Sequence, residues 1–194
     1  MDGNKCVYSV LVVSEKDKLY DSLREILPIE TYSPMDLVHS AGEARRKLVS
    51  GRYDLLIINA PLHDDFGTQL ALDMSDTSMG ILLIVKADLF DSVSYKVENC
   101  GVFTLAKPNS KQAIYSAVKL LSAMNAKLKK MEKIEHALKE KMADIRIVNR
   151  AKWLLIENLK MSENDAHYYI EKQAMDMRMS RREVAQGIIR TYDI

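Results

Sequence analysis

Six basic side chains near the C-terminus are candidates for binding phosphate groups. They remain after the apolar positions of three amphipathic segments between residues 146 and 194 are assigned to a small core. The six are Arg150, Lys152, Lys172, Arg178, Arg181 and Arg182. Helical geometry gathers several of them around the start of the first segment and the turn after the second. Lysine and arginine neutralise backbone phosphates, so the cluster predicts a surface that binds nucleic acid.

A second set of chemically capable residues follows the short apolar runs of the N-terminal part. These polar residues are Ser14, Glu15, Asn59, Lys86 and Lys107. In open parallel sheets, functional side chains collect beyond the carboxyl ends of the strands. The spacing therefore predicts that the five side chains lie together at that edge of one sheet.

The elements that position this second set are alternating strands and helices. Segments with helical character follow short apolar runs at residues 7–13, 55–58, 81–85 and 102–105, with a weaker run at 35–38. Continuously apolar strands are typical of a parallel sheet that helices cover on both faces. We therefore expect residues 1–122 to form an α/β domain with a doubly wound, five-stranded parallel sheet of flavodoxin-like order.

The layout of this part resembles the receiver domain of two-component response regulators over roughly the first 120 residues. The matching positions are Asn59-Ala60-Pro61, then Gly67, then Lys107-Pro108. Receiver domains accept a phosphoryl group on an aspartate. That chemistry needs a carboxylate nucleophile, acidic ligands for Mg²⁺, a hydroxyl that holds the transferred group and a lysine that balances its charge.

Compared with the residues that receiver domains need, the pocket residues of this chain are degenerate. Asn59 stands at the nucleophile's position, and a neutral amide cannot form an acyl phosphate. Ser14 replaces one of the usual acidic pair, which leaves Glu15 as a lone candidate metal ligand. Lys86 stands where a hydroxyl is expected, and only Lys107 keeps its expected identity. We predict no control by aspartate phosphorylation, and no metal or other cofactor.

Two interpretations of the two lysines stay open. In the first, Lys86 and Lys107 reach toward Asn59 and Glu15 and hold the domain in one unphosphorylated state. In the second, Lys86 extends into solvent and the pocket is a relic, because long cationic side chains usually keep their charged ends in water.

The C-terminal segment, residues 146–194, has the pattern of three short amphipathic helices. The first has apolar residues on one stripe, at Val148, Ala151, Leu155 and Leu159. Ser162 with Asp165, and later Ser180 with Glu183, resemble capping boxes that begin the second and third helices. The predicted inner face of the second helix is Ala166, Tyr169, Ile170, Ala174 and Met177. That of the third is Val184, Ala185, Ile188 and Ile189.

The amino-acid sequence of this segment resembles the ANTAR domain, a three-helix RNA-binding module of bacterial transcription antiterminators. The matching residues are Arg150-Ala151-Lys152, Leu155, Ser162-Glu163, Ala166, Ala174-Met175-Asp176 and Arg182-Glu183-Val184-Ala185. One departure is His167, where the family more often has tyrosine. The resemblance implies binding to paired stem-loops in a nascent transcript, which prevents formation of the terminator hairpin.

Between the two parts, residues 111–145 contain neither glycine nor proline and predict one long helix. Apolar residues follow alternating steps of three and four, as in a coiled coil. They are Ile114, Ala117, Leu121, Met124, Leu128, Met131, Leu138, Met142 and Ile145. Glu135 interrupts the seam, and Ile134 offers an alternative phase. We expect a coiled-coil linker at residues 123–145 and a homodimer through residues 121–145.

Charge and composition limit the classes of function. Residues 126–194 carry 15 basic and 11 acidic side chains, whereas residues 1–125 carry 13 and 16, so affinity for nucleic acid belongs to the C-terminal part. Cys6 and Cys100 lie far apart and are expected to be buried thiols. No apolar stretch approaches a membrane span, and the first five residues precede a strand-like run without a cleavage site, so we expect a cytoplasmic protein.

The sequence therefore favours an RNA-binding transcription antiterminator, and two alternatives remain. A DNA-binding response regulator would place the third helix in a major groove, but Glu183, Gln186 and Gly187 form a thin set of base-reading groups. A protein-interaction module, regulated by a partner protein, would suit the loss of acceptor chemistry. An enzyme is the least expected class, because no nucleophile has an adjacent base and no glycine-rich phosphate loop is present.

Overall fold

The computed structural model describes residues 6–192 and divides into two compact units, residues 1–130 and 131–194. Residues 1–5 and 193–194 lie outside the described part. The expectation that no cleavage site precedes the first strand falls on residues 1–5. No helix within residues 6–192 is long and apolar enough to cross a membrane.

The N-terminal unit contains a five-stranded parallel sheet with strand order β2-β1-β3-β4-β5. The strands are β1 (Tyr8–Val13), β2 (Tyr32–Val38), β3 (Leu55–Asn59), β4 (Gly80–Lys86) and β5 (Val102–Lys107). The central strands β1, β3 and β4 are almost continuously buried, as expected where helices cover both faces. The predicted doubly wound fold of flavodoxin-like order is confirmed.

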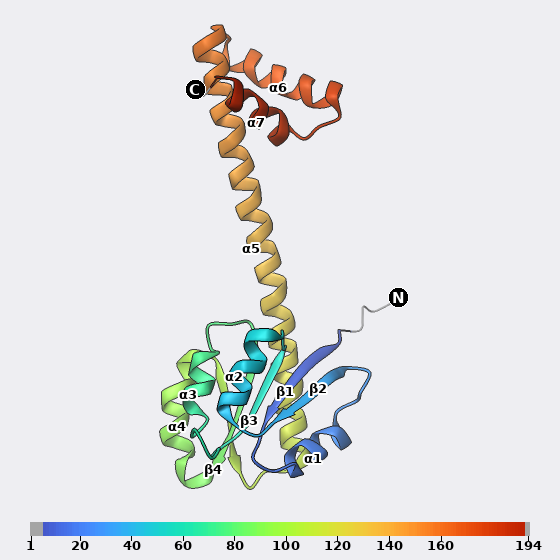
Figure 1. Ribbon diagram of the computed structural model, residues 1–194, viewed down its shortest axis with the longest axis vertical. Coiled ribbons are helices and arrows are strands. Elements are labelled where there is room, and N and C mark those ends of the chain that lie inside the picture. The colour runs from blue at the N-terminus through green and yellow to red at the C-terminus, as the bar shows by residue number, and fades with distance from the viewer. Residues whose placement is uncertain (1–5, 193–194) are drawn as a thin grey trace. The chain divides into compact units, whose positions relative to one another are not determined.

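Helices cover both faces of this sheet (Figure 1). One face packs against α2 (Ala41–Ser50), α3 (Thr68–Asp73) and α4 (Phe90–Val97). The other face packs against α1 (Lys18–Ile26) and the first turns of α5 (Lys111–Leu159). Two short 3-10 helices, η1 (Ala87–Leu89) and η2 (Glu98–Cys100), flank α4. The alternation of side chains along each strand supplies both cores.

Helix α5 is one continuous helix of 49 residues. Its first turns bury Ile114, Ala117, Val118 and Leu121 against the sheet. The expected linker and the expected first helix of the C-terminal module are both parts of this helix. Residues 111–159 contain neither glycine nor proline, so no helix-breaking residue interrupts it.

In the C-terminal unit, the end of α5 packs with α6 (Glu163–Met177) and α7 (Arg181–Tyr192) around a small core (Figure 1). The buried residues are Ala151, Leu155, Ala166, Ile170, Ala174, Val184, Ala185 and Ile188. The predicted three-helix arrangement is confirmed. Ser162 accepts a hydrogen bond from the Asp165 amide, which begins α6 as the sequence predicts.

Three residues assigned to this core are instead exposed: Leu159, Tyr169 and Met177. Leu159 is the last residue of α5, and Lys160 follows in a left-handed conformation with φ of 56°. Tyr169 and Met177 lie beside the narrow stripe that buries Ile170 and its neighbours. Three short helices enclose only a narrow core, so residues at its border remain open to solvent.

The prediction that both cysteines are buried is also wrong. Cys6 and Cys100 are free and exposed. Cys6 precedes β1, and Cys100 lies in η2 after α4. Both positions are outside the elements that form the core.

A polar cluster fastens α5 to the amino ends of the strands in the N-terminal unit. Asp54 is buried, and its carboxylate accepts hydrogen bonds from the Ser9 amide at 2.8 Å, from the Ser9 hydroxyl at 3.0 Å and from the Lys129 ammonium. The buried Asn125 amide donates to the carbonyls of Asp54 at 3.2 Å and Ser78 at 2.8 Å. Burial alone would raise the pKa of Asp54, but the hydrogen bonds from Lys129 and Ser9 outweigh it and lower that pKa.

Replacing Asp54 with Asn is expected to destabilise the protein by about 1–3 kcal/mol, because charge-assisted hydrogen bonds to a buried carboxylate are lost. A lowered folded-state pKa means that this contribution is complete above the unfolded-state pKa of about 3.9 and disappears as the pH falls through the folded value. The difference in the free energy of unfolding between Asp54→Asn and wild type, measured by urea denaturation, should therefore become smaller at acidic pH. Asp76→Asn, an exposed control, should match wild type; equal stability of all three proteins at neutral pH would contradict the assignment.

Candidate functional site

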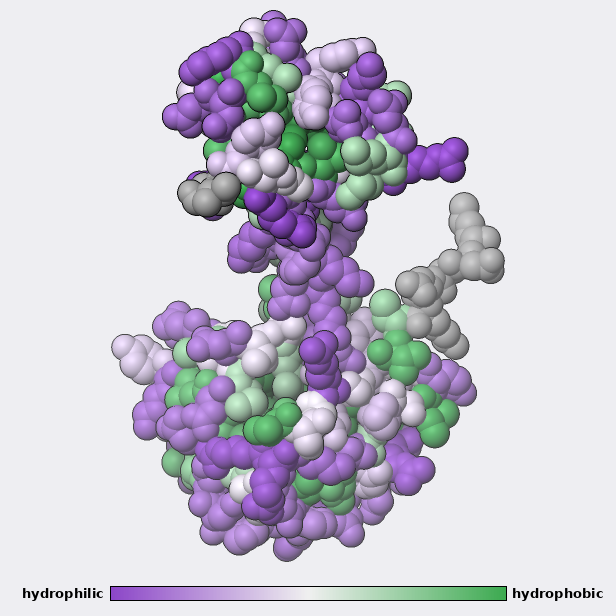
Figure 2. Space-filling view, turned by 45° about the horizontal axis from the view of Figure 1, so that its top comes forward, coloured by the Kyte–Doolittle hydropathy of each residue, from purple (hydrophilic) through white to green (hydrophobic). Residues whose placement is uncertain are grey.

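A groove of about 610 Å³ lies on the C-terminal unit, between α5 and the first residues of α7. Basic side chains converge on it from α5 and α7, and His167 comes from α6. The lining residues are Lys141, Asp144, Ile145, Val148, Asn149, Lys152, His167, Ser180, Arg181 and Arg182. On one face of this unit, apolar side chains are exposed among hydrophilic ones (Figure 2). We refer to this hollow as the basic groove.

Local structure explains how α7 brings two arginines to the groove. Ser180 and Glu183 form a complete capping box: the Ser180 amide donates to the Glu183 carboxylate at 2.8 Å, and the Glu183 amide donates to the Ser180 hydroxyl at 3.2 Å. Bonds from the Ser180 amide and hydroxyl lower the pKa of Glu183. The cap fixes the start of α7, so Arg181 and Arg182 project from its first turn.

The groove cations are held by acidic neighbours. Lys152 Nζ lies 3.0 Å from a carboxylate oxygen of Glu163, and only 16% of the Lys152 side chain is exposed. Arg182 Nη1 lies 2.8 Å from a carboxylate oxygen of Asp144. The Arg181 guanidinium likewise lies 2.9 Å from the carboxylate of Glu171. The ion pairs orient the cations but also partly neutralise them.

The structure brings together three of the six basic residues that the sequence singled out. Lys152, Arg181 and Arg182 line the groove, whereas Arg150, Lys172 and Arg178 do not. Arg178 ends α6 in a left-handed conformation with φ of 55°, and its amide donates to carbonyls of the last helical turn. Its backbone therefore has a structural role in the turn.

Other polar residues of the groove, among them Lys141, Asn149 and His167, were not selected as site residues from the sequence. Lys141 and Asn149 are separated from Lys152 by 11 and 3 residues, which places all three on one side of α5. That spacing was a usable signal for Lys141. His167 lies on α6, and only the packing of α6 against α5 brings it to the groove.

In the N-terminal unit, two of the degenerate pocket residues contact each other directly. The Asn59 side-chain amide donates to the Ser14 hydroxyl at 2.9 Å, and this hydroxyl donates to the Lys16 carbonyl at 2.8 Å. Ser14 is completely buried. The bonds link the ends of β1 and β3, where a receiver domain would hold a carboxylate pair.

The two lysines of this pocket behave differently. Lys86 and Lys107 are register partners at the ends of β4 and β5. Lys107 Nζ donates to the Ala60 carbonyl at 2.5 Å, whereas Lys86 is exposed. Burial, followed by the charge of Lys86, lowers the pKa of Lys107. Glu15 is exposed, and residues 6–192 contain no group of three or more His, Cys, Asp or Glu side chains that could hold a metal ion.

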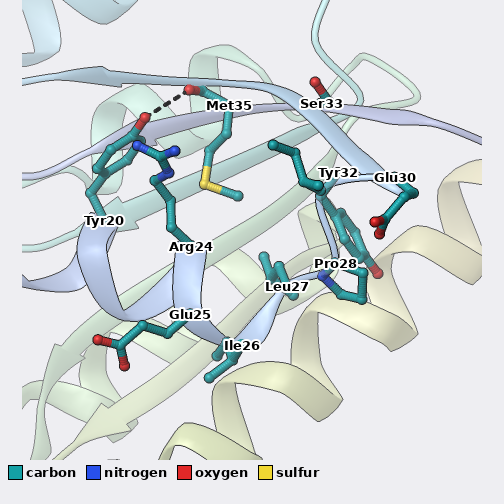
Figure 3. Close-up of a pocket in the computed structure, with 11 residues that line it drawn as sticks. Tyr20, Arg24, Glu25, Ile26, Leu27, Pro28, Glu30, Tyr32, Ser33 and Met35 are labelled. Carbon is teal, nitrogen blue, oxygen red and sulfur yellow. Dashed lines mark hydrogen bonds between the residues drawn. The ribbon is translucent and has the colours of Figure 1, made fainter.

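Another hollow, of about 660 Å³, lies between α1 and the edge strand β2 (Figure 3). The Tyr20 hydroxyl crosses it and donates to the Met35 carbonyl at 3.1 Å. Arg24 lies over the Tyr20 ring, with its guanidinium carbon 5.9 Å from the ring centroid. The tyrosine covers part of the strand edge, and Pro34 lacks the amide that pairing needs, so this surface resembles a protected sheet edge.

Comparisons with known proteins agree with these two units. Residues 136–189 match the family model of the ANTAR domain. The chain is 24% identical to the transcriptional regulatory protein PdtaR of Mycobacterium tuberculosis over 186 residues, or 94% of this chain and 89% of that protein. The chain carries an ANTAR domain preceded by a receiver-like domain.

Solved structures show the fold of the receiver-like domain. A two-component response regulator from Clostridium difficile superposes with a TM-score of 0.52 at 24% identity, covering 59% of this chain and 94% of that chain. A structure named as an adenylate cyclase from Rhodopirellula baltica gives a TM-score of 0.61 at 14% identity, covering 67% and 98%. Such distant similarity shows a shared fold and does not transfer an activity.

Incubation with acetyl phosphate and Mg²⁺ is expected to leave the receiver-like domain unlabelled, because the Asn59 amide cannot accept a phosphoryl group. Asn59→Asp should also label poorly, since Ser14 and Lys86 still replace an acidic ligand and a hydroxyl. Intact-protein mass spectrometry measures the incorporation, with an ordinary receiver domain as the positive control. Stoichiometric labelling that Asn59→Ala abolishes would show this interpretation to be wrong.

Proposed function

We propose that the protein is a non-catalytic transcription antiterminator that binds RNA stem-loops in a nascent transcript through its ANTAR domain. The observation that carries the proposal is the basic groove, where Lys152, Arg181 and Arg182 converge on one surface. The net positive charge of the C-terminal part supports it. Action on nascent transcripts would place the protein in the cytoplasm.

The chemistry of the groove suits an RNA backbone beside unpaired bases. Arginine and lysine donors bind phosphate oxygens, while the exposed apolar wall at Ile145 offers a surface for a base. Side chains cannot reach into the deep groove of an RNA helix, so discrimination falls to loop bases. Tyr168 and Trp153, whose surfaces are 66% and 69% exposed, are available for stacking.

The DNA-binding alternative finds less support in α7. After the two arginines, its exposed side presents Glu183, Gly187 and, in the last turn, Arg190, and Glu183 is engaged in the capping box. An acidic group and a residue without a side chain are poor partners for most base edges in a major groove. The basic groove lies between helices instead of along an exposed recognition helix.

Regulation by aspartate phosphorylation does not fit the receiver-like pocket, so we infer control by a protein partner, a ligand or the abundance of the protein. Asn59 and Ser14 satisfy each other by a hydrogen bond, and the Lys107 ammonium is occupied by the Ala60 carbonyl. The pocket therefore maintains its arrangement without a phosphoryl group.

We further infer a homodimer through residues 121–145 of α5. Apolar side chains remain exposed on this helix, and they are Met124, Leu128, Met131, Ile134, Leu138, Met142 and Ile145. Over the middle of α5 the visible face is mostly hydrophilic, with apolar side chains at its margins (Figure 2). An apolar stripe along a charged helix, here interrupted at Glu135, is typical of a surface that a partner helix covers.

The first test is a gel-shift titration against a tandem stem-loop RNA and a scrambled control. Lys152→Ala and Arg182→Ala are each expected to weaken specific binding on the order of tenfold and to reduce the slope of log K against log salt by about one. Lys172→Ala, an exposed lysine outside the groove, should have a smaller effect. Equal losses in all three variants would contradict the groove as the binding site, and tighter binding to duplex DNA would favour the DNA alternative.

The ion pairs of the groove lead to a second prediction, in which a substitution strengthens RNA binding. Asp144→Asn should strengthen RNA binding by about two- to fivefold, because Arg182 no longer has a competing carboxylate. Glu157→Gln removes the same charge from an exposed position of α5 outside the groove and should change affinity less. Fluorescence anisotropy at fixed salt measures both, and weaker binding by Asp144→Asn would show that the ion pair positions Arg182 for RNA.

A further inference from the structure

The receiver-like pocket contains two cations that RNA binding does not use. Lys86 ends β4 and Lys107 ends β5, and the two are register partners in neighbouring parallel strands, whose backbones lie roughly 4.8 Å apart. Among residues 6–192, neither lysine forms an ion pair with a carboxylate. Two like charges therefore lie side by side at the carboxyl edge of the sheet without a paired negative charge.

Strand periodicity directs the polar side chains of this pocket to one side of the sheet. Residues two positions apart along a strand share a face. In each of four adjoining strands, an apolar residue packs in the core beside α1 and α5, and a polar residue follows two positions later on the same face. The apolar residues are Val12, Ile57, Ile84 and Leu105. The polar residues that follow them are Ser14, Asn59, Lys86 and Lys107.

The charge of this pocket is opposite to the charge that a metal ion needs. Asn59 and Ser14 are neutral, and their side chains bond to each other at 2.9 Å. Glu15 follows Ser14 in the chain, and Asp88 lies two positions after Lys86, but both acidic residues are exposed. Because the lysines supply the only charges that end β4 and β5, the pocket favours an anion.

Both lysines have donors available for such an anion. The Lys107 ammonium has three N–H donors, and the Ala60 carbonyl accepts from one of them. Burial and the neighbouring charge of Lys86 lower the pKa of Lys107, so the charged pair is mutually unfavourable. An opposite charge between the two would offset this repulsion. Lys86 is exposed, and its flexible stem allows the ammonium to turn toward a ligand.

We propose that the receiver-like pocket reversibly binds a small phosphate dianion between Lys86 and Lys107, without a metal ion and without a covalent bond. A phosphate group carries a charge of roughly −1.5 to −2 near neutral pH, which matches two lysines, whereas a carboxylate would leave one of them uncompensated. Lysine binds phosphate as a point charge. The Asn59 amide, which uses one N–H to reach Ser14, adds a neutral donor at the same strand ends.

This ligand site is separate from the basic groove, because it belongs to the N-terminal unit and needs no RNA. Of the three kinds of control inferred above, the proposal selects a ligand. A bound phosphate would replace the repulsion between Lys86 and Lys107 by a bridge that joins the ends of β4 and β5.

The test is isothermal titration of the full chain with inorganic phosphate at constant ionic strength, with glycerol 3-phosphate and acetate as further arms. Phosphate should bind saturably, and acetate should bind about tenfold more weakly or less. Lys86→Ala is expected to weaken phosphate binding about tenfold, whereas Lys96→Ala, an exposed lysine of α4, should match wild type. The tighter of the two phosphate compounds shows whether the pocket prefers a free ion or a phosphate monoester.

Asn59→Asp is a second variant, which keeps both lysines. Its carboxylate would pair with the lysines and repel phosphate, so binding should be lost. Asn99→Asp adds the same charge at an exposed position of η2 outside the pocket and should bind phosphate as wild type does. Circular dichroism of both variants checks that the fold is kept.

Saturable binding that both Lys86→Ala and Asn59→Asp remove would support the site. No saturation by either phosphate compound at about 20 mM would overturn it, as would equal binding by wild type and these two variants. Phosphate binding that is lost in Lys152→Ala instead would belong to the basic groove and would also overturn the proposal. None of these results alters the RNA titration, so the proposed function stands or falls separately.

Discussion

The helical phase of α5 is the constraint on which the described structure depends. One helix supplies Ile114 and Leu121 to the core of the sheet and, further along, Ala151 and Leu155 to the core of the ANTAR domain. Because a helix turns 100° per residue, each core claims a fixed side of it and leaves the rest to solvent or partners. Within the C-terminal unit, α5 buries Ala151 and Leu155 in the core, leaves Met142 and Ile145 exposed, and presents Lys152 to the basic groove.

The sequence was sufficient where local patterns and core periodicity agree. Continuous apolar runs located the strands, and the alternation of strands with helices implied their order. Ser180 with Glu183 located the start of α7, because a capping box is read within four residues. Strand positions and helix caps depend mainly on residues close in the sequence, so they can be predicted without knowledge of the tertiary fold.

What the sequence did not reveal depends on contacts between distant segments. The bonds among Asp54, Lys129 and Ser9 join residues up to 75 positions apart, and nothing local distinguishes Asp54 from other acids. Tyr169 is exposed although its spacing suits an inner face, because the core between the three helices is too narrow to enclose it. Likewise, the partners of the groove cations, such as Glu163 for Lys152, depend on how α5 and α6 pack.

The ion pairs of the groove suggest how a modestly charged protein can bind a polyanion selectively. Each exposed pair contributes about 0–1 kcal/mol, so a carboxylate is a weak ligand that a phosphate can displace. While RNA is absent, Asp144 and Glu163 occupy Arg182 and Lys152, so a phosphate must displace a carboxylate before it binds either cation. The same carboxylates repel an RNA backbone that does not displace them, so a ligand must supply well-placed phosphates to gain the cations. Selectivity then comes from the shape of the RNA, which agrees with recognition of folded stem-loops more than with attraction to any nucleic acid.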